Sequence, residues 1–365
     1  MTASQLYVGI MSGTSLDGID VVIAEIGDDR CQLMSSSYTE YDEQIRVDLL
    51  ALQDRCEDEL HRAEIAGVAL SRLYARAVNA LIEASGIQRA HIRAIGCHGQ
   101  TIRHRPEAGY SKQIFNPALL AELTGLSVVA DFRNRDIAAG GQGAPLVPAF
   151  HAAVFGDQTS DRGVCNIGGI ANLTCLPSTG LVTGFDSGPG NVLLDAWITR
   201  KQGRRFDRDG AWAASGQVIN ALLVKLLDNP YFELPPPKST GRETFNPQLL
   251  DSYELDRYAP ADVQATLSML TATSIADAVA RWCGRPAALY ICGGGAHNAH
   301  LLNQLRMALP DLEISTTAAL GVDPDWVEAL AFAWLAYRAL HNLPGNVPSV
   351  TGARGERVLG AIYPA

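Results

Sequence analysis

The chain has 365 residues, more than one hydrophobic core usually supports, and this length favours two domains. Its composition is that of a globular protein, with 47% hydrophobic and 19% charged residues, and its formal charge of −10 argues against nonspecific binding to nucleic acids or anionic membranes. No stretch reaches the roughly 20 uninterrupted apolar residues of a membrane helix, so we expect no membrane partner.

The cysteine pattern bears on the compartment. Seven cysteines form an odd set without a C-x-x-C pair, and most of them lie in apolar runs. This pattern predicts buried, reduced thiols. No targeting signal is visible, and we therefore expect a cytoplasmic protein.

Residues 6–26 predict a strand, a polar turn and a second strand. The runs LYVGIM and IDVVIAEI flank SGTSLDG, and their β-branched and aromatic residues favour strands. Gly13 and Gly18 can adopt positive φ, and Asp17 tolerates turn geometry. Backbone N–H groups and hydroxyls at such a turn can converge on an anion. Our hypothesis is that this hairpin holds nucleotide phosphates, and the alternative is a plain β-hairpin.

A helix and a strand are expected next. Helix-like spacing of apolar residues predicts a helix over 59–84, and Gly86 suits its C-terminal cap. The strand IRAIGC then runs into HGQTIRHRP, which places polar groups at the carboxyl edge of a sheet, where ligands of open α/β sheets bind. His98 and His104 lack a third ligand at a convincing spacing, so we expect polar surface there and not a metal site.

The segment 127–150 combines charge with a flexible composition. A strand, SVVA, is followed by five charged or amide residues in six positions, DFRNRD. Arginine forks suit oxygen-rich ligands, although these charges can equally pair with one another. The Gly/Ala/Pro loop at 140–148 has the composition of an interdomain connection or a mobile lid.

The opening pattern returns at residues 162–177, RGVCNIGGIANLTCLP, about half a chain later. A further strand ends in GFDSG and places Asp186 at its end, and a helix is expected from Asn191. Two glycine-rich hairpins at this separation predict duplicated halves that face each other across a cleft. The second hairpin thus strengthens the phosphate hypothesis for the first.

Three later segments complete the chain. NPYFELPPPKSTGRETF is too rich in proline for a core element, and it is either a flap or a surface excursion. ALYICGGGAHN predicts a strand, three glycines that permit close approach to a ring or phosphate, and a helix that begins at Asn298. VDPDWVEALAFAWLAYRAL predicts a helix with Glu328 in its first turn.

Several enzyme classes are excluded by their missing motifs. The chain has no Gly-Lys pair and so no P-loop, GGGAHN is not a dinucleotide fingerprint, and no G-x-S-x-G elbow occurs. FDSG matches half of an aspartic-protease pair, but the second half is absent. Phosphoryl transfer remains, because it needs positioning and charge stabilisation above all. Asp186 is then a candidate base, and the alternative is a turn residue before the helix.

The motifs MSGTSLDGID, CHGQTIRH, DFRNRDIAAGGQGAPLVP, NIGGIAN, GFDSGPGN, PPPKSTGRE and CGGGAHN together resemble the anhydro-N-acetylmuramic acid kinase family, within the actin/Hsp70/hexokinase superfamily. The resemblance implies an α/β, two-domain actin/hexokinase-like fold with ribonuclease H-like duplicated halves and an interdomain cleft. We expect an N-terminal domain at 1–145, with the tail 345–365 as a candidate addition, and a C-terminal domain at 146–344.

The resemblance also implies the activity. The family hydrolytically opens 1,6-anhydro-N-acetylmuramic acid with water and phosphorylates the freed O6 with ATP, giving N-acetylmuramic acid 6-phosphate and ADP in cell-wall recycling. It implies ATP and Mg2+ as cofactors, a small sugar substrate, no nucleic-acid partner and a homodimer, while the metal ligands stay open. The alternatives are another sugar kinase that acts on a free hydroxyl, or a nonenzymatic ATP-binding switch.

The resemblance implies roles for individual residues. Asp186 would activate water at the anomeric carbon, and one carboxylate suffices because the γ-phosphoryl group accepts the leaving oxygen. Glu328 is a candidate helper or magnesium-shell group, or it merely favours the helix dipole. The remaining roles are ATP contacts by Ser12, Gly13, Thr14, Ser15, Leu16, Asp17, Gly18, Ile19, Gly168, Gly169, Asn172, Gly293, Gly294 and Gly295, and sugar contacts by Gln100, Thr101 and Arg133, the last to the lactyl carboxylate.

Overall fold

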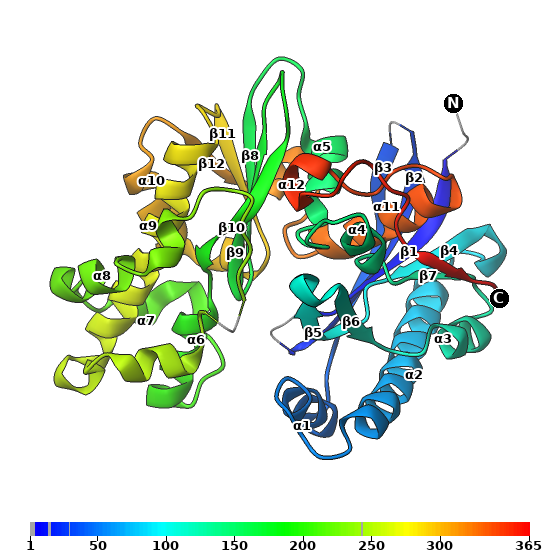
Figure 1. Ribbon diagram of the computed structural model, residues 1–365, viewed down its shortest axis with the longest axis horizontal. Coiled ribbons are helices and arrows are strands. Elements are labelled where there is room, and N and C mark those ends of the chain that lie inside the picture. Colours follow the sequence, from blue (N-terminus) through cyan, green and yellow to red (C-terminus); the bar gives the residue numbers. More distant parts are fainter. Residues whose placement is uncertain (1–3, 14–15, 29, 242–243) are drawn as a thin grey trace. The chain divides into compact units, whose positions relative to one another are not determined.

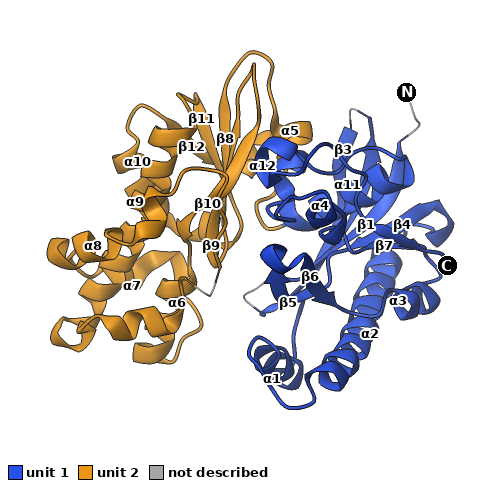
Figure 2. Cartoon of the chain, viewed as in Figure 1, with its two compact units in different colours: residues 1–150, 326–365 blue, residues 151–325 orange. Residues whose placement is uncertain are grey.

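The computed structural model describes residues 4–13, 16–28, 30–241 and 244–365 (Figure 1). The chain divides into two compact units (Figure 2). Unit 1 comprises residues 1–150 and 326–365, and unit 2 comprises residues 151–325. The boundaries at 145/146 and 344/345 remain predictions of functional domains.

Unit 1 is built on a six-stranded sheet with the order β13-β7-β4-β1-β2-β3. The strands β1, β2 and β3 form an antiparallel meander, whereas β4 and β7 run parallel to β1, and β13 closes the edge antiparallel to β7. The bounds are β1 Gln5–Met11, β2 Gly18–Gly27, β3 Arg30–Glu40, β4 Ile92–Cys97, β7 Val128–Ala130 and β13 Ala361–Tyr363; a separate ribbon pairs β5 Gln100–Arg105 with β6 Tyr110–Ile114.

Helices cover both faces of this sheet. Helix α2 (Glu59–Ser85) contributes ten buried residues to a core that includes Val8 and Ile10 of β1, and it ends at Gly86 with φ 69°, which confirms the predicted cap. Its length and composition would suffice to cross a bilayer, but most of its apolar residues pack into this core. The smaller helices of the unit are α1 Glu43–Ala51, α3 Pro117–Thr124, α4 Asn134–Ala138 and α12 Pro348–Thr351.

Helix α11 (Val327–Leu340) lies on the opposite face, across β1, β2 and β4. Two strand glycines permit this packing. A Cβ atom on Gly9 would lie 1.9 Å from the carbonyl oxygen of Ala329, and one on Gly96 would lie 2.0 Å from that of Phe332. The helix backbone therefore approaches the sheet more closely than any other residue type would allow.

Unit 2 repeats the same plan, since its sheet order β10-β9-β8-β11-β12 matches β3-β2-β1-β4-β7 in direction and connectivity. The predicted duplicated halves are thus confirmed. The bounds are β8 Arg162–Ile167, β9 Ile170–Leu176, β10 Thr183–Pro189, β11 Ala288–Cys292 and β12 Glu313–Thr316, with helices α6 Val192–Gln202, α7 Ala211–Ala214, α8 Asn220–Leu227, α9 Pro260–Trp282 and α10 Ala299–Ala308.

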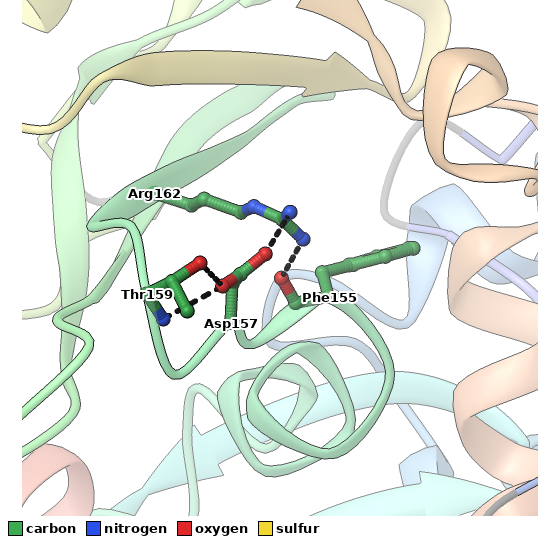
Figure 3. Close-up of polar contacts among 4 residues, drawn as sticks. All are labelled: Phe155, Asp157, Thr159 and Arg162. Atoms are coloured by element: carbon green, nitrogen blue, oxygen red, sulfur yellow. Dashed lines mark hydrogen bonds and ion pairs between the residues drawn. The ribbon is translucent and has the colours of Figure 1, made fainter.

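Helix α5 (Val147–Phe155) carries the chain into unit 2, and a polar turn then leads into β8 (Figure 3). The guanidinium of Arg162 donates to the Phe155 carbonyl at 3.0 Å and pairs with the carboxylate of Asp157. The other carboxylate oxygen accepts from the N–H and hydroxyl of Thr159, at 2.8 and 2.6 Å. These bonds to Thr159, followed by Arg162, lower the pKa of Asp157. The turn thereby fixes the start of the strand that leads to the second hairpin.

One sequence expectation about the cysteines is wrong. Cys175 of β9 and Cys283, which caps the C-terminal end of α9, form a disulfide. The other five are free, and Cys97, Cys165 and Cys292 among them are buried. The two bonded residues are separated by 108 positions, and they meet because α9 packs on β9 and β10.

Candidate active site

The first hairpin is braced from within unit 1 by the HGQ segment. The Ser12 hydroxyl donates to the Gly99 carbonyl at 2.9 Å and accepts from Tyr74 at 3.1 Å, while the Gln100 amide donates to the Gly13 carbonyl at 3.1 Å. Ser12 is 2% exposed and Gln100 is fully buried. The two motifs that the sequence separates by almost 90 residues therefore clasp each other at the ends of the parallel strands β1 and β4.

The remaining hairpin residues divide into core and surface. Leu16 and Ile19 point into the hydrophobic core, so only their backbone groups can face a ligand. Asp17 is exposed, and its carbonyl accepts the N–H of Tyr41 at 2.9 Å. Gly18 lies so close to β3 that a Cβ would be 2.3 Å from the Thr39 carbonyl oxygen. Thr14 and Ser15, both predicted phosphate contacts, lie outside the described residues.

Arg133, the predicted receptor of an anion, is held by its neighbours. Its guanidinium donates to His98 Nε2 at 2.9 Å and to the Gly143 carbonyl at 2.8 Å. Burial, with Arg133 beside it, holds the pKa of His98 well below its usual value. The imidazole ring is therefore neutral, and its Nε2 accepts the hydrogen bond from Arg133. Thr101 is half-buried, and its hydroxyl accepts from Gln113 at 3.0 Å.

The predicted lid or connection at 140–148 is tied to the C-terminal segment through the buried carboxylate of Asp136. One oxygen accepts from the N–H of Gly143 at 2.8 Å. The other accepts from Asn346 at 2.7 Å and from Thr351 at 2.8 Å. Gly143 thus connects the Arg133 guanidinium to this buried network.

The second hairpin, in unit 2, is fixed by the turn that follows β10. The carbonyl of Gly168 accepts from Asn191 at 2.8 Å, and that of Gly169 accepts from Gly190 at 2.9 Å and from Val192 at 3.1 Å. A Cβ on Gly190 would lie 2.3 Å from the Gly168 oxygen. The GPGN motif therefore serves to seat the hairpin at the start of α6.

The three glycines after β11 have different surroundings. A Cβ on Gly293, whose φ is 74°, would lie 2.2 Å from Asn166 Oδ1, and one on Gly295 would lie 2.4 Å from a methyl group of Ile167. These two glycines pack the end of β11 against the end of β8. Gly294 is exposed and has only one atom, 3.9 Å away, near its Cβ position, so it is the glycine that is open to a ligand. Asn298 caps α10 as predicted, accepting from the Leu301 N–H at 3.0 Å.

Asp186 lies on β10, the edge strand of the second sheet, directly beside Asn172 of β9. The Asn172 amide donates to Asp186 Oδ1 at 2.8 Å, and the Thr240 N–H donates to Oδ2 at 2.8 Å. Each carboxylate oxygen thus receives an N–H, an arrangement that favours the ionised form. Asn172, predicted as a phosphate contact, directs its amide to this carboxylate.

Sequence reasoning missed the residues that hold the Asp186 backbone. The Tyr231 hydroxyl donates to the Asp186 carbonyl at 2.7 Å, and the Asp186 N–H donates to the Lys238 carbonyl at 3.3 Å. Burial lowers the pKa of Lys238, and Arg281 adds to that effect, whereas Glu233 and Asp186 raise it. The unusual composition of PPPKSTGRE was the only sequence feature that marked this region, and it did not indicate that the segment contacts Asp186.

Glu328, the second predicted catalytic residue, is half-buried in the first turn of α11 in unit 1. Among the residues that the structure describes, no group of three or more His, Cys, Asp or Glu side chains suits a metal ion. The prediction that His98 and His104 are not metal ligands stays a prediction, and His104 instead bonds Ser111 at 2.9 Å.

The two matching sheets with their glycine-rich hairpins define the class: this is the two-domain actin/hexokinase-like fold of ATP-dependent phosphotransferases. A solved structure of (R)-2-hydroxyglutaryl-CoA dehydratase component A from Acidaminococcus fermentans shares the fold, with a TM-score of 0.50 over 92% of this chain and 98% of that one, at 13% identity.

Closer relatives specify the family. The family profile for anhydro-N-acetylmuramic acid kinase matches residues 5–365. A protein of that name from Thiobacillus denitrificans is 58% identical over 98% of this chain and 97% of its own length. One from Nitrosospira multiformis is 54% identical over 98% and 99%. The chain belongs to the anhydro-N-acetylmuramic acid kinase family.

Proposed function

We propose that this protein opens the 1,6-anhydro ring of 1,6-anhydro-N-acetylmuramic acid with water and phosphorylates O6 with ATP, yielding N-acetylmuramic acid 6-phosphate and ADP for peptidoglycan recycling. The observation that carries the proposal is the carboxylate of Asp186, which two N–H donors hold at an edge strand beside the second hairpin. The family named above supplies the substrate.

Asp186 has a defined task in this reaction. The substrate has no free 6-hydroxyl, so the carboxylate accepts a proton from water while the water oxygen bonds to C1. The bond between C1 and the bridging O6 breaks, and O6 bonds to the γ-phosphorus. The bond from that phosphorus to the β–γ bridging oxygen breaks and releases ADP. Water attack inverts C1, as in inverting glycosidases, and the phosphoryl group replaces the usual acid.

The two hairpins are assigned to the phosphates of ATP. In the first hairpin we assign to them the backbone of Gly13, Leu16, Gly18 and Ile19 and the exposed carboxylate of Asp17. The Ser12 hydroxyl supports this hairpin through its hydrogen bond to the Gly99 carbonyl. Gly168 and Gly169 take the corresponding place in unit 2, and Gly294 is the glycine available to the adenosine, with Gly293 and Gly295 as its supports.

The Mg2+ that accompanies ATP needs few protein ligands, because phosphate oxygens and water supply most of its coordination. The exposed carboxylate of Asp17 and the half-buried carboxylate of Glu328 are oxygen donors that fit this ion. When bound, Mg2+ neutralises charge on the β- and γ-phosphates.

The sugar is assigned to Thr101 and Arg133, with the arginine fork on the lactyl carboxylate. Gln100 is buried and supports this region through its bond to Gly13. We also propose that the enzyme acts in the cytoplasm. We propose that it forms a homodimer, and the molar mass from light scattering of the purified protein tests this.

A coupled assay of ADP release tests the function, with 1,6-anhydro-N-acetylmuramic acid, N-acetylmuramic acid and N-acetylglucosamine as parallel substrates. We expect turnover of the anhydro sugar only. Turnover of the free sugars alone would identify an ordinary sugar kinase, and no turnover of any sugar would favour an ATP-binding switch. In 18O-labelled water, the label should appear at C1 of the product and not in the phosphate.

A further inference from the structure

The catalytic strand β10 lies at the edge of its sheet, so only one of its sides is paired with another strand, β9. Its register shifts between Asp186 and Gly188, and the side chain of the intervening Ser187 is buried, bonded to the Ala171 carbonyl at 3.2 Å. An irregular edge strand does not by itself fix the direction of a carboxylate. Asn172 of β9 holds one carboxylate oxygen, and the further contacts to Asp186 come from residues 231–240.

Tyr231 is the first anchor. It belongs to the short 3-10 turn Pro230–Glu233 and is 7% exposed. Its ring packs edge-on against Phe245, with centroids 5.6 Å apart and planes at 88°. The ring is therefore locked by packing, and its hydroxyl reaches the Asp186 carbonyl at 2.7 Å.

Lys238 is the second anchor, and it is connected to the first. Its ammonium lies 4.7 Å from the centre of the Tyr231 ring and donates to the Tyr231 carbonyl at 3.2 Å. Its own carbonyl accepts the Asp186 N–H at 3.3 Å. Two residues later, the Thr240 N–H reaches Asp186 Oδ2. The position of Lys238 thus determines where the Thr240 N–H, which donates to the Asp186 carboxylate, lies.

We propose that Tyr231 and Lys238 are positioning residues for the hydrolytic step, which lock both backbone groups of Asp186 so that Asn172 and Thr240 hold its carboxylate toward the attacking water. This inference rests on the proposed function. It assigns the PPPKST segment a purpose, namely to supply the Lys238 carbonyl and the Thr240 N–H to Asp186 at the edge of β10. Neither residue touches the reacting atoms in this role.

The test compares Tyr231→Phe, which removes one hydroxyl, with Tyr253→Phe, the same change at a tyrosine in the same hydrophobic cluster. We expect kcat with the anhydro sugar to fall about 10- to 100-fold in Tyr231→Phe, because small misplacements of catalytic groups cost that much. The KM values for ATP and sugar should stay within about twofold, since ground-state binding does not use Asp186. Tyr253→Phe should retain wild-type kcat. Lys238→Met, which keeps the aliphatic stem, should also lower kcat without raising either KM.

A double-mutant cycle shows whether Tyr231 acts through Asp186. In the Asp186→Asn background, Tyr231→Phe should cause no further loss of residual activity. Additive losses would overturn the inference, as would unchanged kcat in Tyr231→Phe well below its melting temperature. If wild-type protein fails to turn over the anhydro sugar, or if Asp186→Asn stays active, the proposed function fails and the inference falls with it. If both behave as proposed and Tyr231→Phe keeps its kcat, the inference alone is wrong.

Discussion

The Asp136 carboxylate and the Asn346 side-chain amide, 210 residues apart in the sequence, share a hydrogen bond of 2.7 Å in the interior of unit 1. The same carboxylate holds Gly143, whose carbonyl bonds the Arg133 guanidinium. A buried polar network therefore joins the C-terminal segment to the proposed anion receptor, and buried networks of this kind are costly to break.

The first prediction concerns this network. Asn346→Leu removes a donor from a fully buried carboxylate, and the free energy of unfolding should fall by about 1–3 kcal/mol. Urea unfolding followed by circular dichroism measures the change. Asn220→Leu, at an exposed position that begins α8, is the control and should alter stability by less than about 0.5 kcal/mol. Equal effects of both changes would contradict the account.

The second prediction concerns Asp186→Asn. The amide keeps the volume of the carboxylate but cannot accept a proton from water, so kcat should fall by about 10²- to 10⁴-fold. ATP affinity, measured by calorimetry, should change little, because the hairpins that we assign to the phosphates stay intact. Near-normal turnover would remove the water-activating role.

The third prediction concerns pH. Burial lowers the pKa of His151 to about 3, below the value of about 6.5 expected in the unfolded chain. Between these values the unfolded chain binds a proton that the folded protein does not. Stability present above pH 6.5 is therefore lost as the pH falls, by up to about 1.4 kcal/mol per pH unit from this residue. His151→Gln should flatten the slope of unfolding free energy between pH 6.5 and 5, whereas His61→Gln, at an exposed position, should not.

The fourth prediction counts thiols. Cys175 and Cys283 are bonded and the other five cysteines are free. Protein denatured without reductant should therefore show five titratable thiols, and seven after reduction. Seven before reduction would show that the bond does not form. In Cys283→Ser the number of thiols titrated without reductant should rise from five to six, because Cys175 loses its bonding partner.

Local sequence chemistry predicted the elements that carry their own signals. The hairpins were visible because glycines and polar residues interrupt β-branched runs, and Gly86 and Asn298 marked helix ends because caps need those residue types. Asp186 was predicted as a base for a similar reason, since the sequence places it at the end of a strand and before a glycine turn. These features depend on neighbours within a few positions.

Features that depend on tertiary approach gave no such signal. Tyr231 meets Asp186 across 45 positions, and nothing in NPYFE distinguishes it from a core tyrosine. The cysteine pair spans 108 positions without a spacing motif. The sugar contact of Gln100 was an implication of the family resemblance, and only the fold reveals that its side-chain amide also donates to the Gly13 carbonyl.

The contact between Gly9 and the carbonyl of Ala329 has a mechanical consequence for the proposed chemistry. Strand β1 leads, three residues later, into Ser12, and Ala329 follows Glu328 directly. The spacing between the first hairpin and that glutamate is thus set by a contact between the backbones of β1 and α11. No side chain lies between them whose rotamer could adjust it. Even an alanine at position 9 would push against the first turn of α11, and a substitution in the core would therefore shift the carboxylate of Glu328 that we propose as a magnesium ligand.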